Sequence, residues 1–242
     1  MDKNIKIFPT PYELAENFAE EIVGLIKESN EKGMPFTVAL SGGSTPGLLF
    51  SLLGDHFAKS VSWEAVHFFW GDERCVSPDN KESNFGLTKG KFLDKIEIPS
   101  SNIHRIRGEE DPVSEALRYS DEILTFTDSR DGLPLFNLFI LGLGDDGHTA
   151  SIFPGQTELL KSGKICEVVS HPFSHQQRIT ITGKVINNSD RITFLVTGKN
   201  KAGIVENIIN KRPDALNFPA YFIVPVYGKL TWFVDKEAAA LL

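Results

Sequence analysis

The sequence has few cysteines, no long apolar run and no excess of positive charge. Its two cysteines, Cys75 and Cys166, lie far apart and outside any Cys-x-x-Cys or Cys/His cluster, which argues against a structural zinc site. They exclude a framework of several disulfides and leave a single bridge open. No apolar run reaches the roughly 18–20 residues that span a bilayer, and the acidic N-terminus, broken by proline and asparagine, is unlike a secretory signal. We therefore expect no membrane partner and a cytoplasmic protein.

Charge and composition are those of an ordinary globular protein. The 242 residues include 25 Lys and Arg against 32 Asp and Glu, a net charge of −7, which disfavours nonspecific binding to nucleic acid or to an acidic membrane. Hydrophobic residues make up 41% of the chain, enough for a sizeable core. There is no internal repeat, low-complexity tract or convincing linker. We expect one domain over residues 1–242, in an oligomeric state that the sequence leaves open.

Helical and strand patterns alternate along the chain. Helices are predicted at about 10–32 with Thr10 as N-cap, after the 41–46 loop, at 112–127 with Asp111 as cap, at 199–211, and in a short last stretch. Strands are predicted at 36–40, 66–70, 138–141, 178–182, 192–197, 221–224 and 230–234. The first is too uniformly apolar to have a solvated face, so it is expected in the middle of a parallel sheet. The pattern predicts a single-domain, Rossmann-like α/β fold whose mostly parallel sheet carries helices on both faces.

Three of these strands each end in a polar loop, at 41–46, 71–74 and 142–148. In open α/β sheets, ligands bind beyond the carboxyl ends of the strands, so the three loops are expected to meet in one site. In the first loop, Ser41, Gly42 and Gly43 precede a helix start, where backbone N–H groups and the helix dipole suit an anion. The same loop also fits a plain tight turn, with Ser44 or Thr45 as N-cap and Pro46 in the first helical position.

The second and third loops carry the groups with the clearest chemistry. Arg74 offers a fork of donors to a phosphate or carboxylate, and Asp72 or Glu73 is expected to hold it in place; the alternative is a solvated charged turn. In the third loop a single glycine separates Asp146 from His148. An imidazole acts as a general base near neutral pH when a carboxylate fixes its tautomer. No serine elbow or paired cysteine indicates covalent catalysis.

Several motifs together resemble a known enzyme family. They are Ser41-Gly-Gly-Ser-Thr-Pro46, Trp70-Gly-Asp-Glu-Arg74, Ser83-Asn-Phe-Gly86, Gly142-Leu-Gly-Asp-Asp-Gly-His-Thr-Ala-Ser-Ile-Phe-Pro154, Arg178-Ile-Thr-Ile-Thr182, Val196-Thr-Gly-Lys-Asn-Lys-Ala202 and Trp232-Phe-Val-Asp235. In this order they resemble the 6-phosphogluconolactonases of the glucosamine-6-phosphate isomerase/6-phosphogluconolactonase family. The resemblance runs over essentially the whole chain.

The resemblance implies hydrolysis of 6-phospho-D-glucono-1,5-lactone to 6-phosphogluconate, the second step of the oxidative pentose phosphate pathway, with a sugar-phosphate lactone as the small-molecule partner. It also implies a reaction without metal or other cofactor and without a covalent intermediate. By the same resemblance, His148 is the base that activates water and Asp146 supports it. Arg74 and Arg178 belong to the phosphate site. The oxyanion formed from a lactone needs donors, for which the backbone N–H groups of the 41–43 loop are candidates.

The sequence departs from the family where a lysine commonly precedes the Arg-Ile-Thr strand. Here the stretch is Ser170-His-Pro-Phe-Ser-His-Gln-Gln177, so His171 or His175 could substitute, or the two arginines could suffice. Lys201 is a further candidate phosphate ligand, by analogy with the related deaminases. The alternative for Lys201, which the pattern favours, is a solvated lysine in the first turn of a helix.

Two other functions compete with the lactonase. Glucosamine-6-phosphate deaminases share the glycine loop and the Asp-Gly-His turn, but they place a tyrosine where Arg74 stands and a glutamate where Phe153 stands. Phenylalanine cannot relay a proton. A non-catalytic sugar-phosphate-binding protein is the second alternative, and no segment suited to DNA reading accompanies such a role here.

Overall fold

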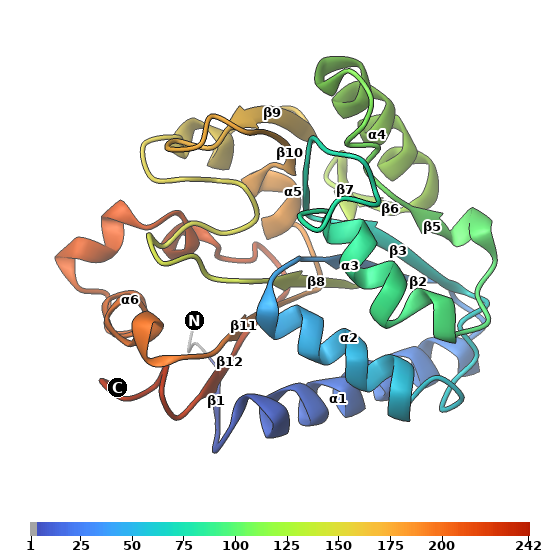
Figure 1. Cartoon of the computed structure of the whole chain (residues 1–242), viewed down its shortest axis with the longest axis horizontal. Helices are drawn as coiled ribbons and strands as arrows, with labels where there is room; N and C mark the ends of the chain where they lie inside the picture. Colours follow the sequence, from blue (N-terminus) through green and yellow to red (C-terminus); the bar gives the residue numbers. More distant parts are fainter. Residues whose placement is uncertain (1–3) are drawn as a thin grey trace.

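A computed structural model describes residues 4–242, and its centre is a seven-stranded sheet (Figure 1). The strand order is β1 (Asn4–Phe8), β12 (Lys229–Asp235), β11 (Arg191–Val196), β8 (Leu138–Leu141), β2 (Phe36–Leu40), β3 (Val66–Trp70) and β5 (Ile103–His104). Every neighbouring pair is parallel. All residues of the central strands β2 and β8 are buried, so elements cover both faces of the sheet. The predicted α/β fold with a mostly parallel sheet is confirmed.

Helices flank this sheet, with α1 and α2 packed against each other on one side (Figure 1). The helices are α1 (Pro11–Glu31), α2 (Ser44–His56), α3 (Asn84–Lys91), α4 (Pro112–Phe126), α5 (Gly183–Asn187) and α6 (Ala202–Ile209). Short 3₁₀ turns are η1 (Leu93–Lys95), η2 (Ser100–Asn102), η3 (Thr157–Leu160), η4 (Lys199–Lys201), η5 (Pro213–Asn217) and η6 (Pro219–Phe222). The caps predicted for α1 and α4 are confirmed: the side chains of Thr10 and Asp111 accept from the N–H groups of Glu13 and Ser114. No helix in residues 4–242 is long and apolar enough to cross a membrane.

A second, three-stranded antiparallel sheet stands beside the first. It has the order β4 (Asp72–Arg74), β10 (Gln177–Ile181), β9 (Cys166–Ser170), and α4 packs against it. The 71–74 segment is therefore largely a strand and not a loop, and the strand predicted at 178–182 belongs to this sheet. Gly71 is the point where the chain passes between the sheets: its N–H donates to Leu40 of β2, and its carbonyl accepts from Ile181 of β10.

Three other local predictions were wrong. The stretch 221–224, predicted as a strand, lies partly in the turn η6, where Ala220 N–H donates to the carbonyl of Gly147. The last residues form turns and not a helix. The N-cap of α2 is Gly43 at a φ of 107°, which favours glycine, and not Ser44 or Thr45. A two-stranded hairpin of β6 (Asp128–Arg130) and β7 (Leu133–Leu135) was not predicted.

The order of the strands places a crevice at the centre of the main sheet. From β2 the chain proceeds to β3 and β5 on one side; it then returns to β8 beside β2 and continues to β11 and β12 on the other side. The direction in which successive strands are added to the sheet therefore reverses between the parallel neighbours β2 and β8. Loops that leave neighbouring strands at such a reversal diverge and open a crevice at the carboxyl edge of the sheet.

Candidate active site

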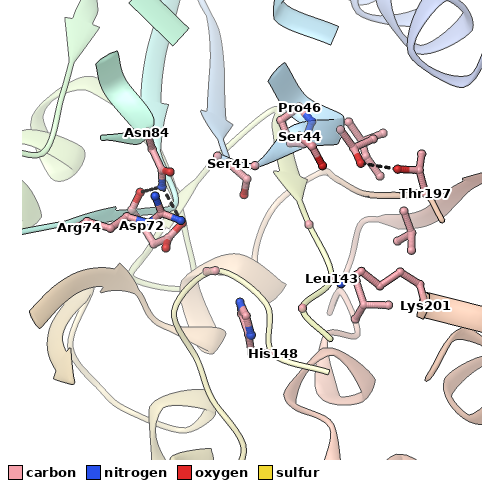
Figure 2. Close-up of a pocket in the computed structure, with 18 of the residues that line it drawn as sticks. Ser41, Ser44, Pro46, Asp72, Arg74, Asn84, Leu143, His148, Thr197 and Lys201 are labelled. Atoms are coloured by element: carbon pink, nitrogen blue, oxygen red, sulfur yellow. Dashed lines mark hydrogen bonds between the residues drawn. The ribbon is translucent and has the colours of Figure 1, made fainter. Parts of the chain in front are cut away.

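A cavity occupies this crevice, and the three predicted loops meet there (Figure 2). Its empty volume, part of it open to solvent, is about 800 Å³. Seven of the eight predicted site residues line it: Ser41, Gly42, Gly43, Arg74, His148, Arg178 and Lys201. The eighth, Asp146, contacts the side chain of His148. The cavity lining also includes Asn84, Ala150, Leu195 and Thr197, which were not predicted as site residues. All but Leu195 lie in the quoted family motifs, so the sequence contained a signal for them.

His148 and Asp146 form a hydrogen-bonded pair at the wall of this cavity. Nδ1 of His148 lies 2.5 Å from Oδ1 of Asp146, and the backbone N–H of His148 donates to the same oxygen at 3.0 Å. Burial disfavours the Asp146 anion, but the hydrogen bonds from His148 outweigh it and lower the pKa of Asp146 to about 2. An ionised Asp146 keeps the ring proton on Nδ1, which leaves Nε2 as the basic nitrogen.

Glycines are required in the loop that carries this pair. A Cβ on Gly144 would lie 2.1 Å from Nδ1 of His148, so any side chain there would displace the imidazole. Gly147 has a φ of 80°, and a Cβ on it would also overlap the Phe218 ring. Phe153, fully buried, packs beneath the His148 ring at 4.8 Å between ring centres. The imidazole of His148 is therefore held by the backbone at Gly144, by the Asp146 carboxylate and by the Phe153 ring.

The glycine loop after β2 presents backbone to the cavity. The Ser41 hydroxyl donates to the carbonyl of Ile140 at 2.8 Å, so this side chain ties the ends of β2 and β8 together. A Cβ on Gly42 would lie 1.8 Å from the Asn84 side chain, which explains the glycine. The N-cap residue Gly43 offers no side-chain acceptor to the first turn of α2. The first N–H groups of α2 are therefore without a capping side chain, at a helix end that favours anions.

A buried polar network supports the opposite wall. Glu73, 2% exposed, accepts hydrogen bonds from the Ser83 hydroxyl and from the backbone N–H groups of Arg74, Asn84 and Phe85. Burial raises the pKa of Glu73 although these bonds favour its anion. The prediction that Asp72 or Glu73 holds the Arg74 guanidinium was wrong. Glu73 orders the backbone around Arg74, while the guanidinium donates to the carbonyl of Glu82.

Asp72 is also turned to a different partner. Its Oδ2 accepts from the Ser151 hydroxyl at 2.5 Å, and its backbone carbonyl accepts from the Asn84 amide at 2.9 Å. Asp72 is 5% exposed and Ser151 is fully buried. This link joins β4 to the segment that follows His148, so it fixes the Arg74 strand relative to the His148 loop.

Arg74 and Arg178 stand directly opposite each other in the antiparallel β4–β10 pair. Opposed residues of such a pair lie on the same face with their Cβ atoms close together, and like charges there repel. Both Nε atoms are buried and have no hydrogen-bond partner among the described residues. Two adjacent guanidiniums with unused donors are the arrangement that an anion would stabilise.

Lys201 lies at the other end of the cavity (Figure 2). Its side chain is 15% exposed and its ammonium pairs with Asp145, which also accepts from the Asn200 amide. The hydrogen bond from Lys201 lowers the pKa of Asp145. The prediction that the sequence pattern favoured, a solvated side chain for Lys201, was therefore wrong. Thr45 and Thr197 share a hydrogen bond of 2.7 Å close to this end.

The comparisons with known proteins agree with this fold. The family model of glucosamine-6-phosphate isomerases/6-phosphogluconolactonase matches residues 9–232. The chain belongs to this family. It is 42% identical to 6-phosphogluconolactonase of Aggregatibacter actinomycetemcomitans over 99% of this chain and 100% of that protein. It is 40% identical to 6-phosphogluconolactonase of Haemophilus influenzae over 97% of this chain and 98% of that protein.

A solved structure extends the agreement to three dimensions. The structure of 6-phosphogluconolactonase from Trypanosoma brucei superposes with a TM-score of 0.88 at 28% identity, covering 99% of this chain and 98% of that one. Monomeric glucosamine-6-phosphate deaminase superposes with a TM-score of 0.83 at 23% identity, covering 99% of this chain and 100% of that one, a likeness that shows the shared fold alone. Both solved structures therefore share the architecture of this chain.

Proposed function

We propose that this protein hydrolyses 6-phospho-D-glucono-1,5-lactone to 6-phosphogluconate. The observation that carries the proposal is the arrangement of the cavity, where the His148–Asp146 pair and two arginines with unused donors line one space. An oriented base and an anion site are what hydrolysis of a phosphorylated lactone requires. The relatives at 40–42% identity carry the name of this activity.

The first chemical step uses His148 as a general base. Asp146 accepts a hydrogen bond from the Nδ1–H of His148. The unprotonated Nε2 therefore removes a proton from water as the water attacks the C1 carbonyl carbon. The imidazolium formed is stabilised by the neighbouring carboxylate. The C1–O bond to the ring then breaks, and the proton on Nε2 passes to the ring oxygen, which gives the open-chain acid. A lactone is an activated ester, so a base and accurate positioning suffice.

Charge that develops on the carbonyl oxygen needs donors. The uncapped first turn of α2 after Gly43 lines the cavity and presents backbone N–H groups from a rigid helix end. We assign the stabilisation of the oxyanion to this loop. Arg74 and Arg178 bind the phosphate, where a dianion removes the repulsion between them. Lys201, held by Asp145, is available to the same substrate at the other end of the cavity.

The alternative activity, deamination of glucosamine 6-phosphate, lacks a proton relay at one position. Phe153 stands where the deaminases place a glutamate, and its ring is fully buried against His148 and His171. The deaminase tyrosine is replaced by Arg74, which lies opposite Arg178. Neither residue can take over the acid–base role of a glutamate, so lactone hydrolysis is the better fit.

The test is a coupled assay near neutral pH. The lactone is generated in place, and formation of 6-phosphogluconate is followed with and without the protein, corrected for spontaneous hydrolysis. We expect a rate above background that His148→Ala lowers by roughly 10²–10⁴-fold. No excess rate, together with ammonia release from glucosamine 6-phosphate, would replace this proposal with deamination. Binding of sugar phosphates without either activity would indicate a non-catalytic sugar-phosphate-binding protein.

A further inference from the structure

The stretch between β9 and β10 lacks the lysine common in the family but contains two histidines, which the structure places differently. His175 is exposed and has a φ of 56°, at a corner of the loop. His171 is half-buried, and its backbone N–H donates to the carbonyl of Gln176 at 2.9 Å, which extends the β9–β10 pairing by one step. Of the two histidines, only His171 therefore continues the β9–β10 pairing.

The register of this sheet puts His171 on the same face as the two arginines. Val169 of β9 stands opposite Arg178 of β10, which in turn stands opposite Arg74 of β4. Side chains alternate along a strand, so His171, two residues after Val169, points to the same side as Val169. Three basic side chains from three segments thus share one face.

Contacts with Phe153 confirm how close these groups are. The His171 ring packs edge-on against the buried Phe153 ring at 4.9 Å between ring centres. The His148 ring contacts Phe153 in a tilted arrangement at 4.8 Å, and the Arg178 guanidinium lies over the Phe153 ring at 5.5 Å. Burial, and then the positive charges of Arg178 and His148, lower the pKa of His171, while Asp146 acts in the opposite direction. Arg74 also contributes to this lowering. His171 therefore lies within the electrostatic field of the arginine pair.

The tautomer of His171 is set by the loop. The backbone N–H groups of Phe173 and Ser174 donate to Nδ1 at 3.3 and 3.1 Å. An Nδ1 that accepts two hydrogen bonds carries no proton, so the ring proton of the neutral side chain is on Nε2. Nε2 is on the edge of the ring away from these two N–H groups. The side chain thus offers one donor, held in orientation by the loop backbone.

We propose that His171 binds the phosphate of the substrate through its Nε2–H, as a third donor beside Arg74 and Arg178. The assignment rests on the proposed function, which supplies the phosphorylated substrate. It adds a donor from a different segment to the arginine pair, so that the phosphate is held by the β9–β10 loop as well as by β4 and β10. His171 thereby contributes to the preference for a phosphorylated lactone over an unphosphorylated one.

The decisive variant is His171→Asn, with His175→Asn as its matched control. The Asn side-chain oxygen can accept the same two N–H groups and keep the turn, while the Nε2 donor is removed. At position 175, asparagine tolerates the left-handed backbone and removes an exposed imidazole from the same loop. Thermal melting of both variants checks that the fold is retained.

Two measurements test the assignment, steady-state kinetics and calorimetric binding of 6-phosphogluconate. We expect His171→Asn to raise KM for the phosphorylated lactone, and Kd for 6-phosphogluconate, by roughly 10–100-fold, as loss of a hydrogen bond to a charged group does. We expect kcat and the hydrolysis of unphosphorylated gluconolactone to stay within about twofold, and His175→Asn to match the wild type.

Unchanged KM and Kd in His171→Asn would overturn the assignment, as would a loss confined to kcat. The calorimetric binding measurement separates failure of the His171 assignment from failure of the proposed function. A wild-type protein that hydrolyses no lactone, yet loses 6-phosphogluconate affinity on His171→Asn, would refute the lactonase activity and keep the phosphate contact. In ¹⁵N spectra of the histidines, addition of 6-phosphogluconate should shift the Nε2 resonance of His171 and leave that of His175 in place.

Discussion

Replacement of Asp146 by asparagine tests the mechanism most directly, because this residue touches His148 and does not line the cavity. Its pKa is about 2 against an ordinary value of 3.8, and the difference corresponds to about 2.4 kcal/mol in favour of the anion. With 35% of the side chain exposed, solvent screening reduces this to about 1–2 kcal/mol. The same interaction favours the imidazolium that forms as His148 takes a proton from water.

Loss of that interaction alone lowers kcat roughly 10-fold, since about 1.4 kcal/mol is a factor of ten in rate. The asparagine amide can also donate to Nδ1 and move the ring proton to Nε2, which removes the base. We therefore expect Asp146→Asn to lower kcat by roughly 10²–10⁴-fold. KM should change by less than about threefold, because the arginine pair and the glycine loop are untouched.

The assay is the coupled formation of 6-phosphogluconate, with kcat and KM determined separately. Asp145→Asn is the matched control: this neighbouring carboxylate pairs with Lys201 and not with His148, so its loss should leave kcat within about threefold. Thermal melting of both variants excludes unfolding as the cause. A kcat in Asp146→Asn within threefold of wild type would refute the proposed role of the pair.

Three further predictions follow from other contacts. Arg74→Ala should raise KM by roughly 10–100-fold with kcat nearly unchanged, measured in the same assay; a loss of kcat alone would contradict its place in the phosphate site. Gly144→Ala should abolish most activity, because the new Cβ would lie 2.1 Å from Nδ1 of His148; wild-type kcat would show that the ring need not hold its position. The third concerns His67 and His104, whose Nδ1 and Nε2 atoms lie 2.9 Å apart and whose pKa values burial lowers. Below about pH 6.5 the unfolded chain therefore binds more protons than the folded one, so the melting temperature should fall from about pH 7 to pH 5. His67→Phe should flatten that slope, and an equal slope in the variant would assign the acid sensitivity to other groups.

Local sequence was sufficient to predict an element wherever the residues of one short segment determine its structure. The strands at 36–40, 66–70 and 138–141 were predicted with the bounds that the structure has. A short, mostly apolar run between turn residues has few ways to be buried other than in a central parallel strand. The caps Thr10 and Asp111 were predicted for the same kind of reason, since an N-cap depends on its next three residues.

Prediction failed where an apolar stretch had more than one way to be buried. Residues 221–224 are apolar enough for a strand, but the neighbouring Ala220 N–H donates to the carbonyl of Gly147, and the first half of the stretch completes the 3₁₀ turn η6. Lys201 looked like an ordinary helix-start lysine because its partner, Asp145, is distant in sequence. The conformation of such a stretch and the partner of such a side chain depend on the part of the protein that packs against them, which a local sequence pattern does not reveal.

The sequence by itself determined the parallel α/β fold, the meeting of three polar segments at one edge of the sheet, and the pairing of His148 with Asp146. That pair is two residues apart, and the glycine between them leaves a turn in which imidazole and carboxylate meet. Tertiary structure decided the rest: that Arg74 and Arg178 stand opposite each other, and that His171 joins their face. Those residues come from separate strands, and only the register of the antiparallel sheet brings their side chains together.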